Sequence, residues 1–176
     1  IGDTPIGSFE EIEYAIIPPG GTHDIDIWDP RWLSSQDLAT VDLPGSEADP
    51  PSPWKGPFIC NPPQTLINRV EFDIVNPRGL FGVNVEDTDG MSPLGFDIEV
   101  EVQEIDNEGV AVGAWTALAT IAEDEERQEP LRWTYGYDLV SAGRYQMRIR
   151  RTDPEDHTAA GHVVQWTGLR GRSIST

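Results

Sequence analysis

The sequence predicts an all-β fold, an antiparallel β-sandwich with an extended N-terminal segment. Three observations predict this class. The 176 residues include 17 glycines and 15 prolines, so that few windows could hold a helix of several turns. The clearest periodic stretches alternate apolar and polar side chains with a period of two, which is typical of strands with one buried face. Turn-forming residues separate these stretches at short intervals, as they do in sandwiches.

The strongest alternation lies in residues 69–75, 95–103 and 144–150. Weaker strand candidates are residues 12–17, 24–28, 115–121, 131–135 and 162–166. Many short, half-polar strands indicate an Ig/fibronectin-III-like sandwich. Among the apolar residues of these strands, we expect five to be buried against one another between the two sheets: Phe72, Val100, Tyr145, Met147 and Trp166.

The chain is predicted to divide into residues 1–60 and residues 61–176. The first part would supply N-terminal strands and a proline-rich connector that packs on the main domain, and the second would form the sandwich. Residues 43–63 contain seven prolines and no alternation, which predicts an extended connector. We expect Trp54 and Phe58 to fix this connector to the surface, and a loose linker is the alternative.

Local signals predict the connections between strands. Residues 106–109 carry the turn residues of a hairpin loop. Pro77 and Gly79 predict a turn after a strand, because proline fixes φ and glycine accepts positive φ, and Leu80 and Phe81 would then cap the core. The acidic run 123–126 is predicted to be a solvated loop.

Arginines concentrate near the end of a strongly acidic chain. Of 12 basic side chains, six are arginines between Arg144 and Arg172, whereas 31 acidic side chains give a formal net charge of −19. Alternation places Arg144, Arg148 and Arg150 on one strand face, opposite the core. We predict that this polar face balances the acidic faces of neighbouring strands, with Glu99, Glu101, Glu71 and Asp73 as partners. A polar contact surface for another protein is the alternative.

Charge and hydropathy exclude two classes of partner. A net charge of −19 argues against nucleic acid or an anionic membrane, because phosphate binding needs a basic surface. No apolar run is long enough to span a bilayer, so no membrane insertion is expected. The chain opens with Ile1, which suggests a piece of a larger protein.

No catalytic residue, cofactor site or metal site is predicted. Cys60 is the single cysteine, so no intrachain disulfide can form, and it lies in the proline-rich connector without an evident partner. Residues 84–90 fail the EF-hand pattern, and in residues 23–26 the histidine faces away from the two aspartates. Nucleophile motifs and phosphate-binding glycine loops do not occur. Calcium on the acidic loops would be adventitious.

The six tryptophans leave a carbohydrate-binding platform open. Trp115, Trp133 and Trp166 lie in strand-like contexts, where tryptophan is usually a core or half-buried anchor. Their burial would favour a structural module, whereas exposed coplanar rings would favour a carbohydrate-binding module. A glycoside-cleaving domain is a third and more distant alternative, because it needs two carboxylates flanking a cleft.

Three stretches in a fixed order resemble one family. They are WKGPFICNPPQTLINRVEFDIVNPRGLFG (54–82), GAWTALAT (113–120) and AGRYQMRIRRTDPEDHTAAGHVVQWTGLRG (142–171). Their order resembles an internal module of the phage tail tip attachment protein, the protein J family of lambda-like long-tailed phages and prophages. Residues upstream of position 54 match more loosely.

The resemblance implies a non-catalytic structural module of a tail tip or hub (host specificity) protein. It implies no catalytic residues, and it implies other tail proteins and other domains of the same hub protein as partners. The full-length protein would be a homotrimer in the tail tip of the virion, made in the cytoplasm of the bacterial host. The module would act in tail-tip assembly and in presentation for host attachment.

Overall fold

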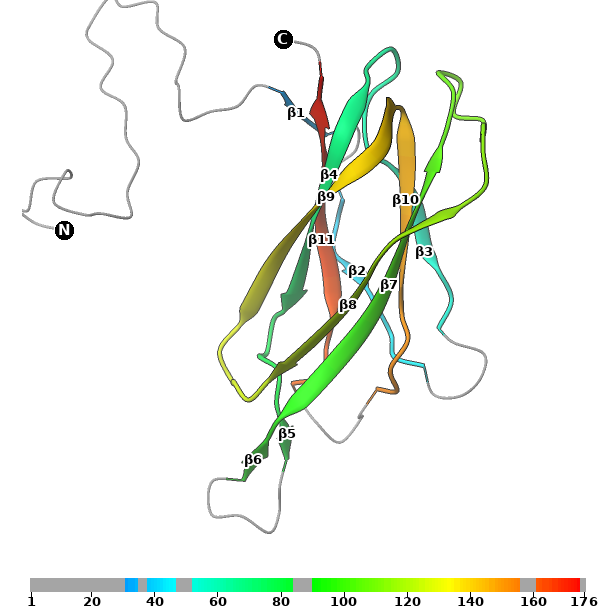
Figure 1. Ribbon diagram of the computed structural model, residues 1–176. Helices are drawn as coiled ribbons and strands as arrows, with labels where there is room; N and C mark the ends of the chain where they lie inside the picture. Colours follow the sequence, from blue (N-terminus) through cyan, green and yellow to red (C-terminus); the bar gives the residue numbers. More distant parts are fainter. Residues whose placement is uncertain (1–30, 35–37, 47–51, 84–89, 156–160, 175–176) are drawn as a thin grey trace, which may run out of the picture. The chain divides into compact units, whose positions relative to one another are not determined.

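The computed structural model describes residues 31–34, 38–46, 52–83, 90–155 and 161–174, which all lie in the compact unit Arg31–Thr176 (Figure 1). The strand candidates 12–17 and 24–28 lie outside the described residues. Within the described part, regular structure consists of eleven strands, and every pairing between them is antiparallel. The predicted all-β, antiparallel fold is confirmed.

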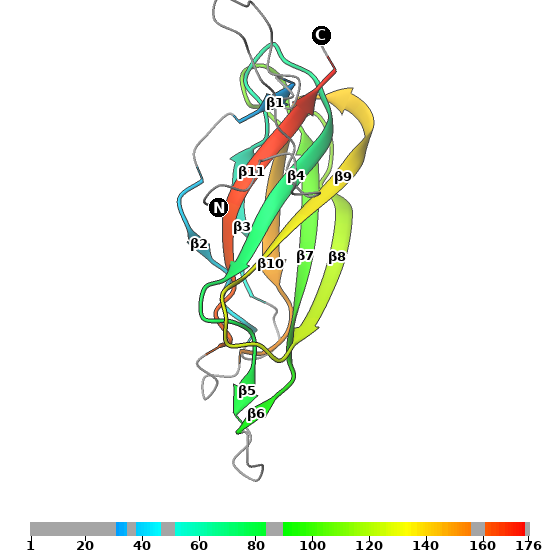
Figure 2. The same ribbon diagram turned by 90° about the vertical axis from the view of Figure 1, so that its left-hand side faces the viewer.

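The strands form two main sheets that face each other (Figure 2). The first sheet has the order β1 (Trp32–Leu33), β11 (Gln165–Ser173), β4 (Ile67–Asn76) and β9 (Leu131–Gly143), and β2 (Val41–Asp42) also pairs with β11. The second sheet has the order β3 (Lys55–Ile59), β10 (Tyr145–Arg151), β7 (Leu94–Glu104) and β8 (Thr116–Glu125). A small hairpin pairs β5 (Gly82–Val83) with β6 (Met91–Ser92).

The three strongest predicted strands are present as β4, β7 and β10. Of the weaker candidates, 115–121 falls in β8, 131–135 falls in β9, and 162–166 overlaps the start of β11. Strand β9 runs to Gly143, further than its sequence pattern indicates, because β4 pairs with it from Leu131 to Asp138 and again at Gly143.

The core lies between the two sheets and contains all five residues predicted for it. Phe72, Met147, Trp166 and Val100 are fully buried, and Tyr145 nearly so. Aromatic contacts also join the sheets. The rings of Phe58 on β3 and Trp166 on β11 meet edge to face with centroids 5.0 Å apart. Such pairs add to the free energy that burial of the rings contributes.

The prediction of an extended connector over residues 43–63 is wrong for Lys55–Ile59, because this segment forms the edge strand β3. The ladder between β3 and β10 shifts register between Met147 and Ile149, opposite the cis peptide Gly56–Pro57. Proline lacks a donor and is tolerated at such an irregular sheet edge, which is why the strand signal was missing from the sequence. The expected anchoring by Phe58 is confirmed, since it packs against the core.

The division into residues 1–60 and 61–176 stays a prediction. Among the described residues of the first part, β1 and β2 pair with β11, and β3 pairs with β10. Cys60 is buried in the core cluster, and its backbone N–H donates to Tyr145 O at 2.8 Å.

The acidic run 123–126 was predicted to be a loop, and this is wrong for Glu123–Glu125. These residues end β8, because the long strand β7 supplies partners for them: Phe96 lies opposite Glu123, and Leu94 lies opposite Glu125. Glu123 is half-buried and accepts a hydrogen bond from Tyr135 Oη at 2.8 Å.

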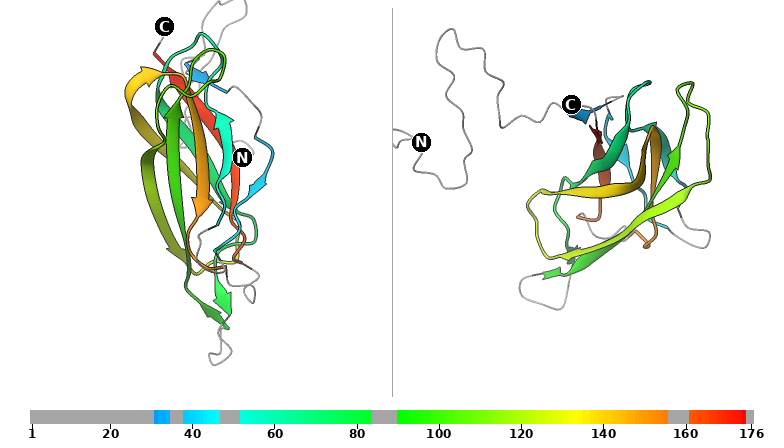
Figure 3. Two further views of the ribbon diagram at one scale, coloured as in Figure 1. Left: turned by 90° about the vertical axis from the view of Figure 1, so that its right-hand side faces the viewer. Right: turned by 45° about the horizontal axis from the view of Figure 1, so that its top comes forward.

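The predicted turns are confirmed. Gly79 has a φ of 82°, and its N–H donates to Asn76 O at 3.2 Å. The following Leu80 is fully buried in the core. Gly109 has a φ of 86° in the loop from β7 to β8, where its N–H donates to Asp106 O at 3.1 Å. Figure 3 shows this loop and the turn from β9 to β10 at the same end of the sandwich.

Candidate functional site

Two predicted arginines lie on the outer face of the second sheet and pair with two predicted acidic partners. Strand β10 sets Arg148 opposite Glu101 and Arg150 opposite Glu99 on β7. Arg148 donates to Glu101 Oε2 from Nε at 2.8 Å and from NH2 at 2.5 Å. Arg150 donates from Nε to Glu99 Oε2 at 2.7 Å. The predicted cross-strand pairing is confirmed for these two arginines.

Tryptophan rings enclose the same guanidinium groups. The Cζ atom of Arg148 lies 4.4 Å from the centre of the Trp54 ring and 4.1 Å from that of Trp115. Arg150 Cζ lies 4.5 Å from the Trp54 ring centre. A guanidinium over an indole face is attracted by the ring quadrupole, which stabilises each stack. We call this surface the arginine–tryptophan face; it consists of Trp54, Glu99, Glu101, Trp115, Arg148 and Arg150.

Arg144 was predicted to share this face, and this is wrong. It precedes β10 and is buried, with 7% of its surface exposed. Its Nε donates to Asn61 O at 3.2 Å and its NH1 donates to Asp106 O at 2.7 Å. Because the strand begins only at Tyr145, alternation does not extend to Arg144, and the side chain turns in to satisfy backbone carbonyls instead.

Glu71 and Asp73 were also expected to pair with these arginines, and they pair elsewhere. They lie on β4 in the first sheet, so the core separates them from β10. Arg170 on β11 contacts Glu71 Oε2 at 2.9 Å and Asp73 Oδ2 at 3.3 Å. Burial alone would raise the pKa of Asp73, but hydrogen bonds from Thr134 and Arg132 and the charge of Arg170 lower it.

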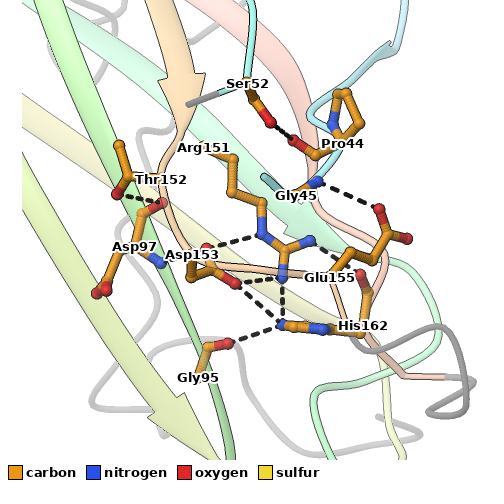
Figure 4. A network of polar contacts seen from close by, with 10 residues as sticks. All are labelled: Pro44, Gly45, Ser52, Gly95, Asp97, Arg151, Thr152, Asp153, Glu155 and His162. Atoms are coloured by element: carbon orange, nitrogen blue, oxygen red, sulfur yellow. Dashed lines mark hydrogen bonds and ion pairs between the residues drawn. The ribbon is translucent and has the colours of Figure 1, made fainter. Parts of the chain in front are cut away.

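A second, buried polar cluster was missed by the sequence analysis (Figure 4). Arg151 at the end of β10 is fully buried, and its NH2 lies 2.6 Å from Asp153 Oδ2. The same guanidinium contacts His162 Nε2 and donates from NH1 to His162 O at 3.1 Å. Arg151 follows Tyr145, Met147 and Ile149 at the core-facing parity, and that spacing was the available signal.

This cluster ties four segments together at one end of the sandwich. Asp153 Oδ1 accepts from the Asp97 amide at 2.8 Å, and His162 Nε2 lies 2.8 Å from Gly95 O. The Ser46 amide donates to Asp153 O at 2.7 Å. Burial alone would raise the pKa of Asp153, but hydrogen bonds from His162, Arg151 and the Asp97 amide lower it to about 2. The cluster therefore has a structural role, because its hydrogen bonds and ion pair hold these segments together.

The tryptophans predicted as anchors occupy different positions. Trp166 is fully buried, and its Nε1 donates to Gly168 O at 2.9 Å. Trp133 is half-buried, and its ring meets Phe96 edge to face at 5.6 Å. Trp115 is half-buried and, like Trp54, stacks on a guanidinium at the sheet surface. An arginine guanidinium lies over each of these two rings, whereas a carbohydrate-binding platform needs uncovered aromatic rings.

Among the described residues, no group of three or more histidine, cysteine, aspartate or glutamate side chains could hold a metal ion. The weak candidates at residues 23–26 and 84–89 lie outside the described part. Burial raises the pKa of the Cys60 thiol far above its usual range, which disfavours a nucleophilic thiolate. The part of the chain that the structure describes contains no helix long and apolar enough to cross a membrane.

Comparison with known proteins gives the family. Curated proteins yield no match to the chain. A family model described as "Tip attachment protein J, FNIII-A domain" matches residues 56–171, which run from the second residue of β3 to Gly171 in β11. The match agrees with the two-sheet antiparallel fold and with the resemblance seen in the sequence. The chain therefore belongs to the family of the FNIII-A domain of tip attachment protein J.

Proposed function

We propose that this chain is a non-catalytic structural module of a phage or prophage tail tip (host specificity) protein, which takes part in tail-tip assembly and in presentation for host attachment. The family match is the observation that carries the proposal, because it covers the sandwich from β3 to β11. The module acts by packing and by presenting surfaces to neighbouring proteins.

The use of charged side chains in the fold supports a structural role. Arg148, Arg150, Arg151 and Arg170 all form ion pairs with carboxylates of this chain. An ion pair between neighbouring strands helps to hold the two strands in register. Three of these pairs, those of Arg148, Arg150 and Arg170, join neighbouring strands, as expected of a structural module.

The proposal extends to the setting of the module. The full-length protein is a homotrimer, and it works in the virion tail tip after synthesis in the host cytoplasm. Other tail proteins and other domains of the same hub protein are the partners. The arginine–tryptophan face is a polar contact surface for such a partner through Arg148 and Arg150, whereas Arg144 is buried and does not contribute to it.

Carbohydrate binding is the alternative function, and the half-buried Trp54 and Trp115 are the observation that keeps it open. A sugar ring stacks on a bare indole face, but both of these rings already lie against Arg148. Glycan arrays with the purified chain separate the two functions. We expect no binding; saturable binding that is lost in Trp115→Ala and Trp54→Ala would favour the carbohydrate-binding module.

Immunogold labelling tests the proposed location. An epitope inserted after Glu129, in the exposed turn between β8 and β9, leaves both strands intact. In particles of the phage or prophage that encodes the chain, we expect the label at the tail tip. Label elsewhere on the virion, or tagged protein that never enters infectious particles, would contradict the proposal.

A further inference from the structure

The large apolar side chains that stand out into solvent gather at one end of the sandwich. Among the described residues they are Leu66, Val110, Val112, Val140 and Ile174. Leu66 precedes β4, Val110 and Val112 lie between β7 and β8, Val140 is near the end of β9, and Ile174 follows β11. The strands are antiparallel, so these positions lie at the same end, which we call the apolar end.

A cavity of about 390 Å³ opens at the apolar end between the edge strands β8 and β9. Figure 2 and Figure 3 show these two strands along the same side of the sandwich. Core-packed or buried side chains line the cavity: Val102, Leu118, Leu139 and Tyr145. Its size and apolar lining suit one or two large apolar side chains.

Two irregularities in the sheets open this cavity. In the ladder between β4 and β9, Arg69 faces Asp138 and Ile67 faces Gly143, so residues 139–142 bulge from β9. In the ladder between β7 and β8, the register shifts at Leu118. Bulges at a sheet edge redirect side chains, and here they turn Val140 fully into solvent at the cavity rim.

Both strands also have an unused edge. In the described part of the chain, β8 pairs only with β7 and β9 pairs only with β4. Unpaired backbone groups at a sheet edge accept an extended segment of another chain, with side chains entering adjacent pockets. The apolar end therefore offers backbone partners beside an apolar cavity.

Charge identifies the kind of segment that fits. Glu104 and Asp138 line the cavity, and Glu104 also lines a neighbouring cavity of about 460 Å³ together with Asp106 and Glu108. No ion pair joins Glu104 to another described residue. Asp138 already contacts Arg69 NH1 at 3.0 Å, and Arg144 also lines the second cavity, so Glu104 and the exposed Glu108 are the carboxylates that favour a basic partner. A second copy of this chain, with a net charge of −19, fits poorly, as do residues 1–30, which contain seven acidic residues and neither lysine nor arginine.

We propose that the apolar end binds an extended segment of another protein, in which an apolar side chain enters the cavity between β8 and β9 and is flanked by lysine or arginine. The proposal deepens the proposed function and rests on it in one respect, that the partner is a protein of the tail.

Titration of the isotopically labelled 176-residue chain with capped heptapeptides, followed by NMR, tests the proposal. One peptide has a central leucine flanked by lysines, the second a leucine flanked by glutamates, and the third a serine flanked by lysines. We expect the first to shift the backbone amides of Thr116–Leu118 and Leu139–Ser141, and to bind at least about fivefold more tightly than the other two.

Matched variants test whether the first peptide binds at the cavity between β8 and β9. Ala117 is exposed and lines the cavity, so Ala117→Phe fills the cavity from outside and should weaken the first peptide at least about tenfold. Thr120→Phe, on an exposed position of the same strand outside the cavity, should leave it unchanged. Glu104→Gln should reduce the preference for lysine, whereas Glu126→Gln should keep it. Neither glutamate replacement alters an apolar core residue, so they remain informative if Ala117→Phe misfolds.

Three results would overturn the proposal. The first is that no peptide shifts the amides around the cavity. The second is that the lysine- and glutamate-flanked peptides bind equally. The third is self-association in sedimentation experiments that Ala117→Phe abolishes, because a second copy would then be the occupant. Each of these is independent of the immunogold result, so failure of the docking site is distinguishable from failure of the tail-tip location.

Discussion

The guanidinium carbon of Arg148 lies 4.1 Å from the centre of the Trp115 ring, while its NH2 lies 2.5 Å from Glu101. The most arginine-rich strand of an acidic protein thus directs its charge to carboxylates and aromatic rings of its own fold. A surface arranged in this way is ordered before any partner arrives, which lowers the entropy lost on contact.

Replacement of Arg148 by alanine should lower the free energy of unfolding by about 1–2 kcal/mol, since it removes two ring contacts and one ion pair. Replacement of Arg127 by alanine is the matched control, because Arg127 is exposed and contacts Glu125 at 3.5 Å. It should lower the free energy of unfolding by less than about 0.5 kcal/mol. Urea unfolding of both variants measures the difference. Equal effects would show that stacking on Trp54 and Trp115 contributes nothing.

Nucleic-acid binding should be undetectable near physiological ionic strength. Arg148 and Arg150 are neutralised by Glu101 and Glu99, and the chain carries a net charge of −19. Mobility-shift titration with DNA and RNA checks this. Salt-sensitive binding that falls in an Arg148→Glu, Arg150→Glu variant would contradict the assignment of these arginines.

Trp166→Ala should destabilise the domain by about 3–5 kcal/mol, because the ring is fully buried between the sheets against Phe58. Val140→Ala, at a fully exposed position, serves as the control and should change stability little. Thermal and urea unfolding report both. A midpoint of Trp166→Ala within a degree or two of the parent would be incompatible with the sandwich core.

Acid should destabilise the domain through Asp153. Its folded-state pKa of about 2 lies below the ordinary value of 3.8, so its ionised form stabilises the fold above about pH 4, and this stabilisation is lost as pH falls toward 2. Asp153→Asn should make the free energy of unfolding less dependent on pH in this window. The same substitution should lower the free energy of unfolding by about 3–5 kcal/mol near neutral pH, because the buried Arg151 would keep its charge without its ion-pair partner. An unchanged acid slope would show that the buried cluster does not titrate in this way.

Gly79→Ala should lower the free energy of unfolding by at least about 2 kcal/mol. The residue has a φ of 82°, and an added Cβ would meet the backbone oxygen of Arg127, so the turn after β4 cannot relax easily. Gly113→Ala, where an added Cβ meets nothing within 4 Å, is the control. Comparable losses in both variants would contradict the backbone argument.

The sequence predicted the parts of the fold in which side-chain alternation and burial agree. Strands β4, β7 and β10 follow such a pattern, and their apolar faces form the core. Alternation failed where other forces decide the structure. Strand β3 contains Pro57, which predicts a connector, and the end of β8 is acidic, which predicts a loop. Both segments form strands because a neighbouring strand offers partners.

The candidate sites show the same limit. Pairing of Arg148 with Glu101 was predictable, since both residues lie on outward faces of strong strands. The contacts of Trp54 and Trp115 with that arginine were not, because these rings lie just outside strands whose register depends on tertiary structure. Arg144 and Arg151 are both buried, and neither burial was predicted, since burial of a charge depends on partners such as Asp153 that only the folded chain brings near.

Excision of residues 31–174 from the reading frame that encodes them tests the structural role in the tail tip most directly. Tail completion is counted by electron microscopy and host adsorption by titre, with a synonymous recoding of the same residues as control. We predict that particles lacking the module have incomplete tail tips or fail to adsorb, while the recoded control is normal. Particles with complete tails and undiminished adsorption would contradict a structural role for this domain in the tail tip.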